Sequence, residues 1–327
     1  MRAATSKHAP PVEPANGRAK AGAGGRPAGP RPRIGIHTSI AGGVERAADR
    51  ARALGCECLQ IFSASPRQWR AITPSAAACA ELTARRRQYG LEPLAIHVNY
   101  LVNLASAEAS LRQRSQAAFR GELERAAALK ADFLILHPGS MGAEDASAGS
   151  GETGPGAPPR DREAARVRLA AAIRETAAGF AWGRLRLLIE NTAGGGGRLG
   201  GDFRELAAIL DLLRGLPAGA CLDTCHCWVA GYDLVSEAGY RETCRHIERE
   251  LGRERVFVWH ANDTRSRLGS RLDRHEHIGA GNLGPGLFRR MLHDARWKQA
   301  AFILETPLEK DGDDRRNLQT LLRLRDA

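Results

Sequence analysis

A charged stretch of the sequence, residues 259–284, holds its densest set of side chains able to bind a metal ion. Three histidines and three acids share it: His260, Asp263, Asp273, His275, Glu276 and His277. Imidazole together with carboxylate suits zinc or a similar divalent ion. Arginines are interleaved with them, and a guanidinium group grips phosphate oxygens in a bidentate fork. Taken alone the stretch could be a charged surface loop. Together with the rest of the chain it predicts metal chemistry on a phosphate substrate.

Similar side chains follow the short apolar runs of the chain. Seven of eight such runs, each interpreted as a strand, end in a residue able to bind metal: His37, His97, His137, Glu190, Asp223, His260 and Glu305. One histidine after an apolar run is usually a hydrogen-bonded core residue, but seven equivalent positions are not expected by chance. Two pairs add to them, Asp223 with His226 and Asp273 with His275. These are too many ligands for one tetrahedral zinc, so the sequence predicts two or three ions.

The elements that must position these residues alternate regularly. The remaining apolar run ends at Phe62, and segments with helical periodicity lie between the runs, for example residues 107–130 and 202–213. Continuous apolar runs are typical of strands buried on both faces. Eight strand–helix units over residues 34–327 predict a (β/α)8 TIM barrel, which typically takes about 250 residues. Active sites of such barrels lie at the carboxyl ends of the strands, where the seven residues would meet.

A doubly wound open sheet is the structural alternative. Such a sheet usually carries a glycine-rich dinucleotide-binding loop after its first strand. Residues 41–43, Ala-Gly-Gly, do not match that fingerprint. The barrel is therefore the preferred prediction.

We expect a single domain over residues 34–327, preceded by a disordered basic tail over residues 1–33. The tail holds seven Lys or Arg against one acid, together with six prolines and five glycines. Residues 141–159, rich in Gly, Ala, Ser and Pro, are predicted to be a flexible insertion after the fourth strand. Four consecutive glycines at 194–197 predict a loop where backbone could approach a ligand closely.

The charge and the cysteine content of the chain indicate its partners and its cellular compartment. The formal net charge of +11 favours polyanionic partners, but the tail carries more than half of it, so any nucleic-acid surface on the barrel must be local. The seven cysteines lack the spacing of a secreted scaffold and indicate reduced thiols. Cys221, Cys225 and Cys227 could bind zinc, but small buried residues are the preferred interpretation. Without a membrane span or signal peptide we expect a cytoplasmic protein.

Several longer motifs keep a fixed order along the chain. They are residues 67–69 (Arg-Gln-Trp), 100–104 (Tyr-Leu-Val-Asn-Leu), 137–140 (His-Pro-Gly-Ser), 189–194 (Ile-Glu-Asn-Thr-Ala-Gly), 221–226 (Cys-Leu-Asp-Thr-Cys-His), 230–234 (Ala-Gly-Tyr-Asp-Leu), 270–275 (Ser-Arg-Leu-Asp-Arg-His), 278–279 (Ile-Gly) and 281–284 (Gly-Asn-Leu-Gly). In these motifs the chain resembles the endonuclease IV family of apurinic/apyrimidinic endonucleases, over residues 34–307. The resemblance implies a TIM barrel with three Zn²⁺ ions that cleaves double-stranded DNA at abasic sites.

All nine metal ligands of that family have a counterpart in this sequence. The resemblance implies three groups: His97, His137 and Glu190; Glu190, Asp223, His260 and Glu305; and His226, Asp273 and His275. Glu190 would bridge two ions. His37 is not a ligand in the family and would contact either phosphate or a metal ligand instead, while His277 has no implied role.

The implied reaction is hydrolysis of the phosphodiester 5′ to the abasic site, leaving a 3′-hydroxyl and a 5′-deoxyribose phosphate. Trimming of blocked 3′ ends would be a secondary activity. Two metals sharing Glu190 would lower the pKa of a water molecule towards 7 and neutralise the phosphate. Either Glu190 or Glu305 could also orient the attacking water as the catalytic carboxylate.

Damage recognition is expected to depend on extruding the abasic nucleotide, which is easiest where base pairing is already lost. Three residues resemble those that the family inserts into the base stack: Arg67, Tyr100 and Leu101. Arg67, Gln68 and Trp69 combine a cation, an amide and an aromatic ring in one turn, which is suited to a minor-groove wedge. Ordinary packing is the alternative for Tyr100 and Leu101. Arg274, which lies between two ligands, is the strongest candidate for a phosphate contact.

The sequence departs from the family pattern at Ser65-Pro66, Val98-Asn99, Cys227 and residues 141–159, and none of these departures removes a ligand. A divalent-metal sugar isomerase is the runner-up prediction, but such sites use few histidines and no third metal. A barrel that binds damaged DNA without cutting it would have lost ligands. The family precedent predicts a monomer.

Overall fold

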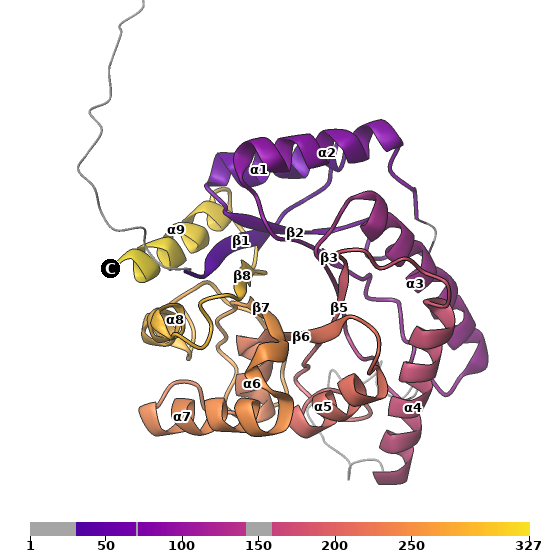
Figure 1. Cartoon of the computed structure of the whole chain (residues 1–327). Helices are drawn as coiled ribbons and strands as arrows, with labels where there is room; N and C mark the ends of the chain where they lie inside the picture. Colours follow the sequence, from indigo (N-terminus) through magenta and orange to yellow (C-terminus); the bar gives the residue numbers. More distant parts are fainter. Residues whose placement is uncertain (1–30, 70, 142–158) are drawn as a thin grey trace, which may run out of the picture. The chain divides into compact units, whose positions relative to one another are not determined.

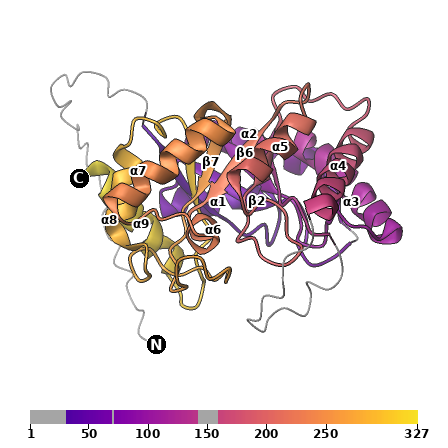
Figure 2. The ribbon, with the colours of Figure 1, turned by 90° about the horizontal axis from the view of Figure 1, so that it is seen from below.

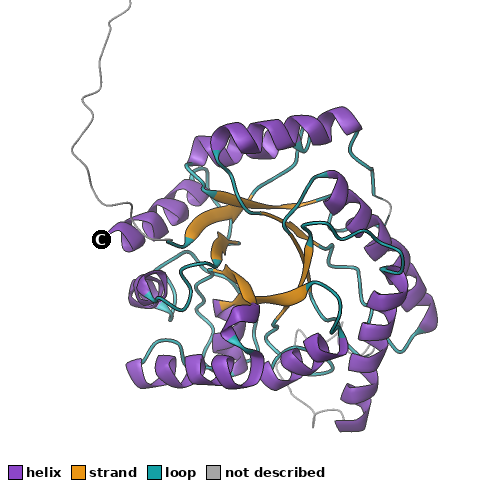
Figure 3. Cartoon of the chain, viewed as in Figure 1, coloured by secondary structure: helices purple, strands orange, loops and turns teal. Residues whose placement is uncertain are grey.

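The computed structural model describes residues 31–69, 71–141 and 159–327. Within them, eight parallel strands close into a barrel in chain order (Figure 1, Figure 3). The strands are β1 (Arg33–His37), β2 (Cys58–Phe62), β3 (Leu94–His97), β4 (Phe133–Leu136), β5 (Arg186–Glu190), β6 (Ala218–Asp223), β7 (Val256–His260) and β8 (Ala301–Leu304). The predicted TIM barrel is confirmed. His137 and Glu305 follow the last residue of their strands.

Helices between the strands surround the barrel (Figure 3). They are α1 (Glu45–Leu54), α2 (Ala76–Tyr89), α3 (Ala109–Ala128), α4 (Pro159–Thr176), α5 (Phe203–Leu212), α6 (Thr224–Ala230), α7 (Glu237–His246), α8 (Gly284–His293) and α9 (Asp313–Asp326). A π-helical turn (Ile247–Leu251) and a 3₁₀ turn (Arg253–Arg255) follow α7. Helices α3 and α4 pack side by side in both views (Figure 1, Figure 2), and α9 packs against β1.

The two helical segments predicted in detail are confirmed within two residues at each end. Residues 107–130 contain α3, and residues 202–213 contain α5. Asp202 begins α5 because its carboxylate accepts a hydrogen bond from the backbone N–H of Arg204 at 2.7 Å. A side-chain oxygen at this position satisfies one of the backbone donors that a helix leaves free at its first turn.

The strands divide the core into an inner and an outer layer because successive side chains point to opposite faces. The inner layer is small: Cys58, Ala95, Ile135, Leu188, Cys221, Val258, Ala301 and Ile303. The alternate residues, such as Leu59, Ile61 and Leu134, join the larger cluster beneath the helices. At Gly35 there is no room for any side chain, since an added Cβ would lie 2.0 Å from the carbonyl oxygen of Cys58.

The boundaries of the predicted tail and insertion differ slightly from the observed elements. Residues 1–30 and 142–158 lie outside the described part of the chain. Arg33, which we assigned to the tail, already belongs to β1, and Pro159 already belongs to α4. Met141 is held by a hydrogen bond from its N–H to the carbonyl of Gly197 at 3.0 Å.

No helix within residues 31–69, 71–141 and 159–327 is both long enough and apolar enough to cross a membrane. All seven cysteines are buried free thiols.

Candidate metal centre

One layer of polar side chains caps the inner core at the carboxyl ends of the strands. Each member stands two residues after Gly35 or after an inward residue of the core, so the alternation of the strand brings it to the same face. The layer comprises His37, Gln60, His97, His137, Glu190, Asp223, His260 and Glu305. Seven of the eight are the strand-end residues predicted from the sequence.

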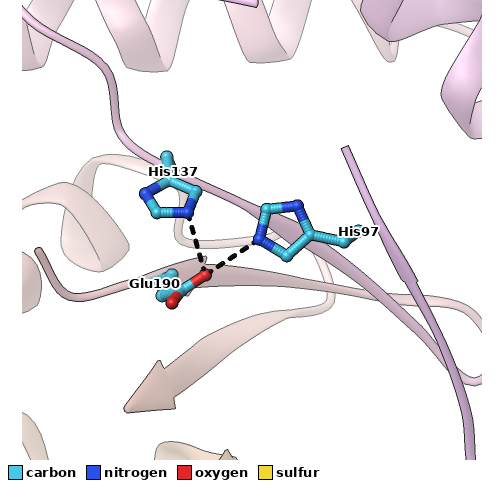
Figure 4. A group of neighbouring side chains, drawn as sticks. All are labelled: His97, His137 and Glu190. Carbon is cyan, nitrogen blue, oxygen red and sulfur yellow. Dashed lines mark hydrogen bonds and ion pairs between the residues drawn. The ribbon is translucent and has the colours of Figure 1, made fainter. Parts of the chain in front are cut away.

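Glu190 lies at the centre of this layer and is fully buried. Its Oε2 lies 3.1 Å from His97 Nε2 and 3.3 Å from His137 Nε2, so both imidazoles point at the same oxygen (Figure 4). Its Oε1 lies 3.0 Å from His260 Nδ1. The two carboxylate oxygens therefore face different histidines, which is the geometry that a bridging ligand requires.

A second group extends from Glu190 towards β8. Ligand atoms of Glu190, Asp223, His260 and Glu305 all lie within 4.8 Å of one another. His260 Nδ1 lies 3.3 Å from Glu305 Oε2 as well as facing Glu190. Asn262 ties the group together: its amide nitrogen donates to Asp223 Oδ2 at 2.6 Å, and its oxygen accepts from the backbone N–H of Glu305 at 2.9 Å.

The third group joins α6 to the loop after β7. Asp223 caps α6 by accepting from the backbone N–H of His226 at 3.0 Å, which fixes His226 on the first helical turn. His226 Nε2 lies 3.0 Å from Asp273 Oδ2, and His275 Nε2 lies 3.3 Å from Asp273 Oδ1. The Asp-x-x-His and Asp-x-His pairs seen in the sequence thus converge from segments about 50 residues apart.

The acids and imidazoles of this centre lie so close together that their pKa values are strongly shifted. Burial alone would raise the pKa of Glu190, but the facing His137 and His260 hold it well below its usual range. Burial opposes charge on His275 too, yet Asp223 and Asp273 raise its pKa to about 9. His137 behaves differently, since desolvation lowers its pKa. Paired charges of this kind concentrate at functional sites.

Four histidines anchor one ring nitrogen and leave the other facing carboxylates. The Nδ1–H groups of His97, His226 and His275 donate to the backbone carbonyls of Val98, Asn191 and Glu305, at 2.7, 2.9 and 3.1 Å. His260 uses the opposite nitrogen, and its Nε2 lies 2.9 Å from Gln60 Oε1. Metal-ligating histidines almost always donate their second N–H in this way.

The donor set fits divalent metal ions. His275 Nε2 is buried and has no hydrogen-bond partner among the described residues, although it lies between Asp223 and Asp273. A buried ring nitrogen without a partner is costly unless something binds it. The nitrogen and oxygen donors form three groups with the same members as the three predicted ligand sets. Within each group the ligand atoms lie within 4.8 Å of one another. The thiols of Cys221 and Cys225 lie beside two of the groups, but burial raises the pKa of Cys221 to about 12 and also raises that of Cys225.

The charged stretch, residues 259–284, holds six side chains that are able to bind a metal ion, and only three of them reach this centre. His260, Asp273 and His275 do. Asp263 instead organises the loop, accepting hydrogen bonds from the backbone N–H groups of Thr264, Gly279, Gly281, Leu283 and Gly284. Glu276 pairs with Arg265 at 2.7 Å, and His277 lies 3.0 Å from the side chain of Asn317.

The predicted DNA-contact residues lie around the centre, His37 at the end of β1 and the others on loops. His37 Nδ1 lies 3.2 Å from Glu305 Oε1 inside the layer. Tyr100 is 62% exposed and its ring lies 5.9 Å from that of His97, while Leu101 beside it is half-buried. Arg67 and Gln68 are exposed on the loop after β2, which Asn99 joins by donating to the Gln68 carbonyl at 3.4 Å.

A cavity of about 570 Å³ opens beside the metal centre. His137, His226 and Asp273 form part of its wall, and Tyr100 and Leu272 contribute apolar surface. Three arginines also line it: Arg198, Arg271 and Arg274. Arg271 is held in place by a hydrogen bond from its guanidinium to the Ala193 carbonyl at 3.2 Å. The cavity therefore combines ligand side chains, cations and apolar groups.

Sequence reasoning missed Gln60, the eighth member of the polar layer. The apolar run of β2 continues to Phe62, so attention to the strand end alone passed over it. The signal that identifies it is its spacing, two residues after the inward-facing Cys58. The scaffold role of Asn262 had no signal in the sequence, because it depends on contacts with β6 and the end of β8.

Comparison with known proteins agrees with this geometry. The family model described as "Xylose isomerase-like TIM barrel" matches residues 48–326. A protein of Solibacter usitatus named "Probable endonuclease 4" is 46% identical over 292 residues, covering 88% of this chain and 95% of the relative. The crystal structure of endonuclease IV from Thermus thermophilus matches with a TM-score of 0.76 at 39% identity, covering 90% of this chain and 99% of that one.

More distant structures share the fold alone. A D-psicose 3-epimerase from Clostridium cellulolyticum has a TM-score of 0.62 at 14% identity, covering 90% of this chain and 98% of that one. With a relative this similar over nearly the whole barrel and a family model over residues 48–326, the chain belongs to the endonuclease IV family, within the xylose isomerase-like TIM barrels.

Proposed function

We propose that this protein hydrolyses the phosphodiester 5′ to abasic sites in double-stranded DNA, leaving a 3′-hydroxyl and a 5′-deoxyribose phosphate. It would also trim blocked 3′ ends and act as a monomer. The observation that carries the proposal is the convergence of nine nitrogen and oxygen ligands in three groups beside a cation-lined cavity. Kinship with proteins named endonuclease 4 supports it.

The three groups would hold three Zn²⁺ ions, with Glu190 shared between two of them. Such ions would lower the pKa of a water molecule and neutralise phosphate charge. Glu190 and Glu305 would be the carboxylates that orient that water; an oxygen of each lies within 3.3 Å of His260 Nδ1, which supports a shared site. Hydrolysis then adds water across the phosphorus–O3′ bond, so the oxygen leaves as the 3′-hydroxyl.

The residues around the cavity would bind the damaged strand. A deoxyribose without its base could enter the cavity, which is lined by Tyr100 and three arginines. His37 and Arg274 would contact phosphate, and Arg67, Gln68, Tyr100 and Leu101 would fill the gap left in the duplex. Inserting side chains at an unpaired position costs little because the pairing energy is already lost.

The test uses an end-labelled duplex with one abasic site and the full-length protein, with metal content measured in the same sample. We expect incision on the 5′ side and its loss after prolonged chelation that removes about three zinc equivalents. A zinc-loaded protein that leaves the abasic duplex intact would contradict the proposed function. An undamaged duplex of the same sequence is the control.

A further inference from the structure

Gln60 is the one uncharged amide in the polar layer of the barrel, and its side chain is fully buried. It pairs in register with His37 on β1 and with Ala95 on β3. Burying an amide is costly unless its hydrogen bonds are made. The contacts that it makes therefore indicate what it contributes.

The amide joins three residues of the metal centre. Its nitrogen donates to Glu305 Oε1 at 2.6 Å and lies 3.0 Å from His37 Nδ1, and its oxygen lies 2.9 Å from His260 Nε2. An ionised carboxylate can only accept hydrogen bonds. The NH₂ end must therefore face Glu305, which turns the amide oxygen towards His260.

This orientation determines the state of His260. An amide oxygen can only accept, so His260 Nε2 must carry a hydrogen. In the neutral ring, Nδ1 then presents its lone pair, and Nδ1 is the atom that faces Glu190 at 3.0 Å and Glu305 at 3.3 Å. Among the four anchored histidines, His260 alone is held by a side chain; the others are held by backbone carbonyls.

We propose that Gln60 is a positioning residue for metal binding: it holds His260 with Nδ1 available and holds Glu305 alongside it. The inference rests on the proposed function, in which both residues are ligands of one ion. Gln60 touches neither His97 and His137 nor His226 and His275 through any hydrogen bond in the described part of the chain. Loss of the Gln60 side chain should consequently lower the affinity for one ion and leave the affinity for the other two unchanged.

The experiment measures zinc affinity by competition with a chromophoric chelator on the full chain carrying Gln60→Leu. Loss of a partner that orients a ligand typically costs about 10- to 100-fold in metal affinity, and we expect that loss for one of three equivalents. Gln116→Leu is the matched control, since Gln116 also donates to a carboxylate, that of Glu175 at 2.9 Å, on the exposed surface of α3.

A second readout reports on His260 directly. In the zinc-loaded wild type, ¹⁵N shifts of labelled histidine should show a protonated Nε2 and a metal-bound Nδ1 on His260, and this signature should be lost in the variant. If Gln60→Leu does not fold, Gln60→Ala, which leaves room for water, takes its place. Wild-type zinc affinity at all three sites in either variant would overturn the inference, as would Nε2 coordination of His260 in the wild type. Failure of the proposed function is distinguishable, because it appears in the wild type as zinc loading without cleavage.

Discussion

Glu190 Oε1 lies 3.0 Å from His260 Nδ1, and the two side chains are fully buried at the mouth of the barrel. The partners are 70 residues apart in the sequence, and the other oxygen of Glu190 faces His97 and His137. An uncompensated buried carboxylate would be strongly unfavourable. The histidines that face Glu190 therefore stabilise its charged form, and in the proposed function bound ions would do the same.

Replacing Glu190 by glutamine keeps its size and removes its charge. The variant should lose about 10³-fold or more in the cleavage rate, because a metal bridge supplies several kcal/mol of charge stabilisation. Single-turnover cleavage of an abasic duplex at saturating enzyme measures the loss. Glu124→Gln, on the exposed face of α3, should cleave at the wild-type rate. Equal rates for Glu190→Gln and the wild type would sink the metal mechanism.

Removing the metal should also destabilise the barrel. An ion that binds only the folded protein adds about 2.7 kcal/mol at a free concentration 100 times its Kd. For a domain of this size we expect the Tm to fall by about 5–10 °C per ion removed. Differential scanning calorimetry before chelation, after chelation and after zinc is restored checks this, and an unchanged Tm would argue against structural coupling of the ions.

The stability of the metal-free protein should fall as the pH rises from about 6.5 to about 9. Asp223 and Asp273 raise the pKa of the largely buried His275 to about 9, above an unfolded value near 6.5. The folded state then binds more protons than the unfolded state in this window, so the contribution is complete below pH 6.5 and is lost through pH 9. Its size is on the order of 3 kcal/mol.

Urea unfolding across this pH range measures the effect, with His275→Gln as the comparison. The zinc-loaded protein should lack the dependence because an ion replaces the proton. Stability of the metal-free protein that rises between pH 6.5 and 9 would contradict the assignment.

Arg274 should act through salt-dependent binding. Its side chain is exposed and lines the cavity between two candidate ligands. Arg274→Ala should weaken binding to abasic duplex and reduce the slope of log K against log salt by about 1, as for one phosphate contact. Fluorescence anisotropy at several salt concentrations measures the slope. Arg214→Ala is the control, because Arg214 is 79% exposed and lies at the opposite end of the barrel, between α5 and β6. Equal slopes for the two variants would show that Arg274 does not contact a phosphate.

Gly35→Ala should disrupt the barrel itself. The added Cβ would meet the carbonyl oxygen of Cys58 at 2.0 Å, within the pairing of β1 and β2. Because backbone must move to relieve the overlap, we expect a loss of about 3 kcal/mol or more in the free energy of unfolding. Gly286→Ala is the matched control, since nothing lies within 4 Å of its added Cβ and alanine is favoured in a helix. Equal unfolding free energies for the two variants would show that the barrel tolerates a side chain at position 35.

Much of the site could be predicted because it follows from a local pattern. Each strand is a short apolar run, and a polar residue such as His97 or Glu190 marks where it ends. In a parallel barrel all such ends meet on one rim, so equivalent positions in sequence become neighbours in space. The pairs Asp223/His226 and Asp273/His275 are local as well, and their spacing survives in the structure.

The local pattern also suggested metal-binding residues that do not reach the centre, and it missed one residue that does. Asp263, Glu276 and His277 share the charged stretch with His260, but the path of the loop turns them to its own backbone, to Arg265 and towards Asn317. Gln60 sits inside an apolar strand and has no motif of its own. Its role depends on its register against β1 and β3 and on closure of the barrel.

The amino-acid sequence by itself determined the eight strand–helix units, the chemical type of the ligands and the family, because periodicity and motif spacing are local properties. The tertiary structure alone decided which nitrogen of each histidine faces inward, which oxygen of Glu190 serves which partner, and that Gln60 anchors His260. Those contacts join residues as far as 200 positions apart, and only the closed sheet brings their backbones into a fixed register.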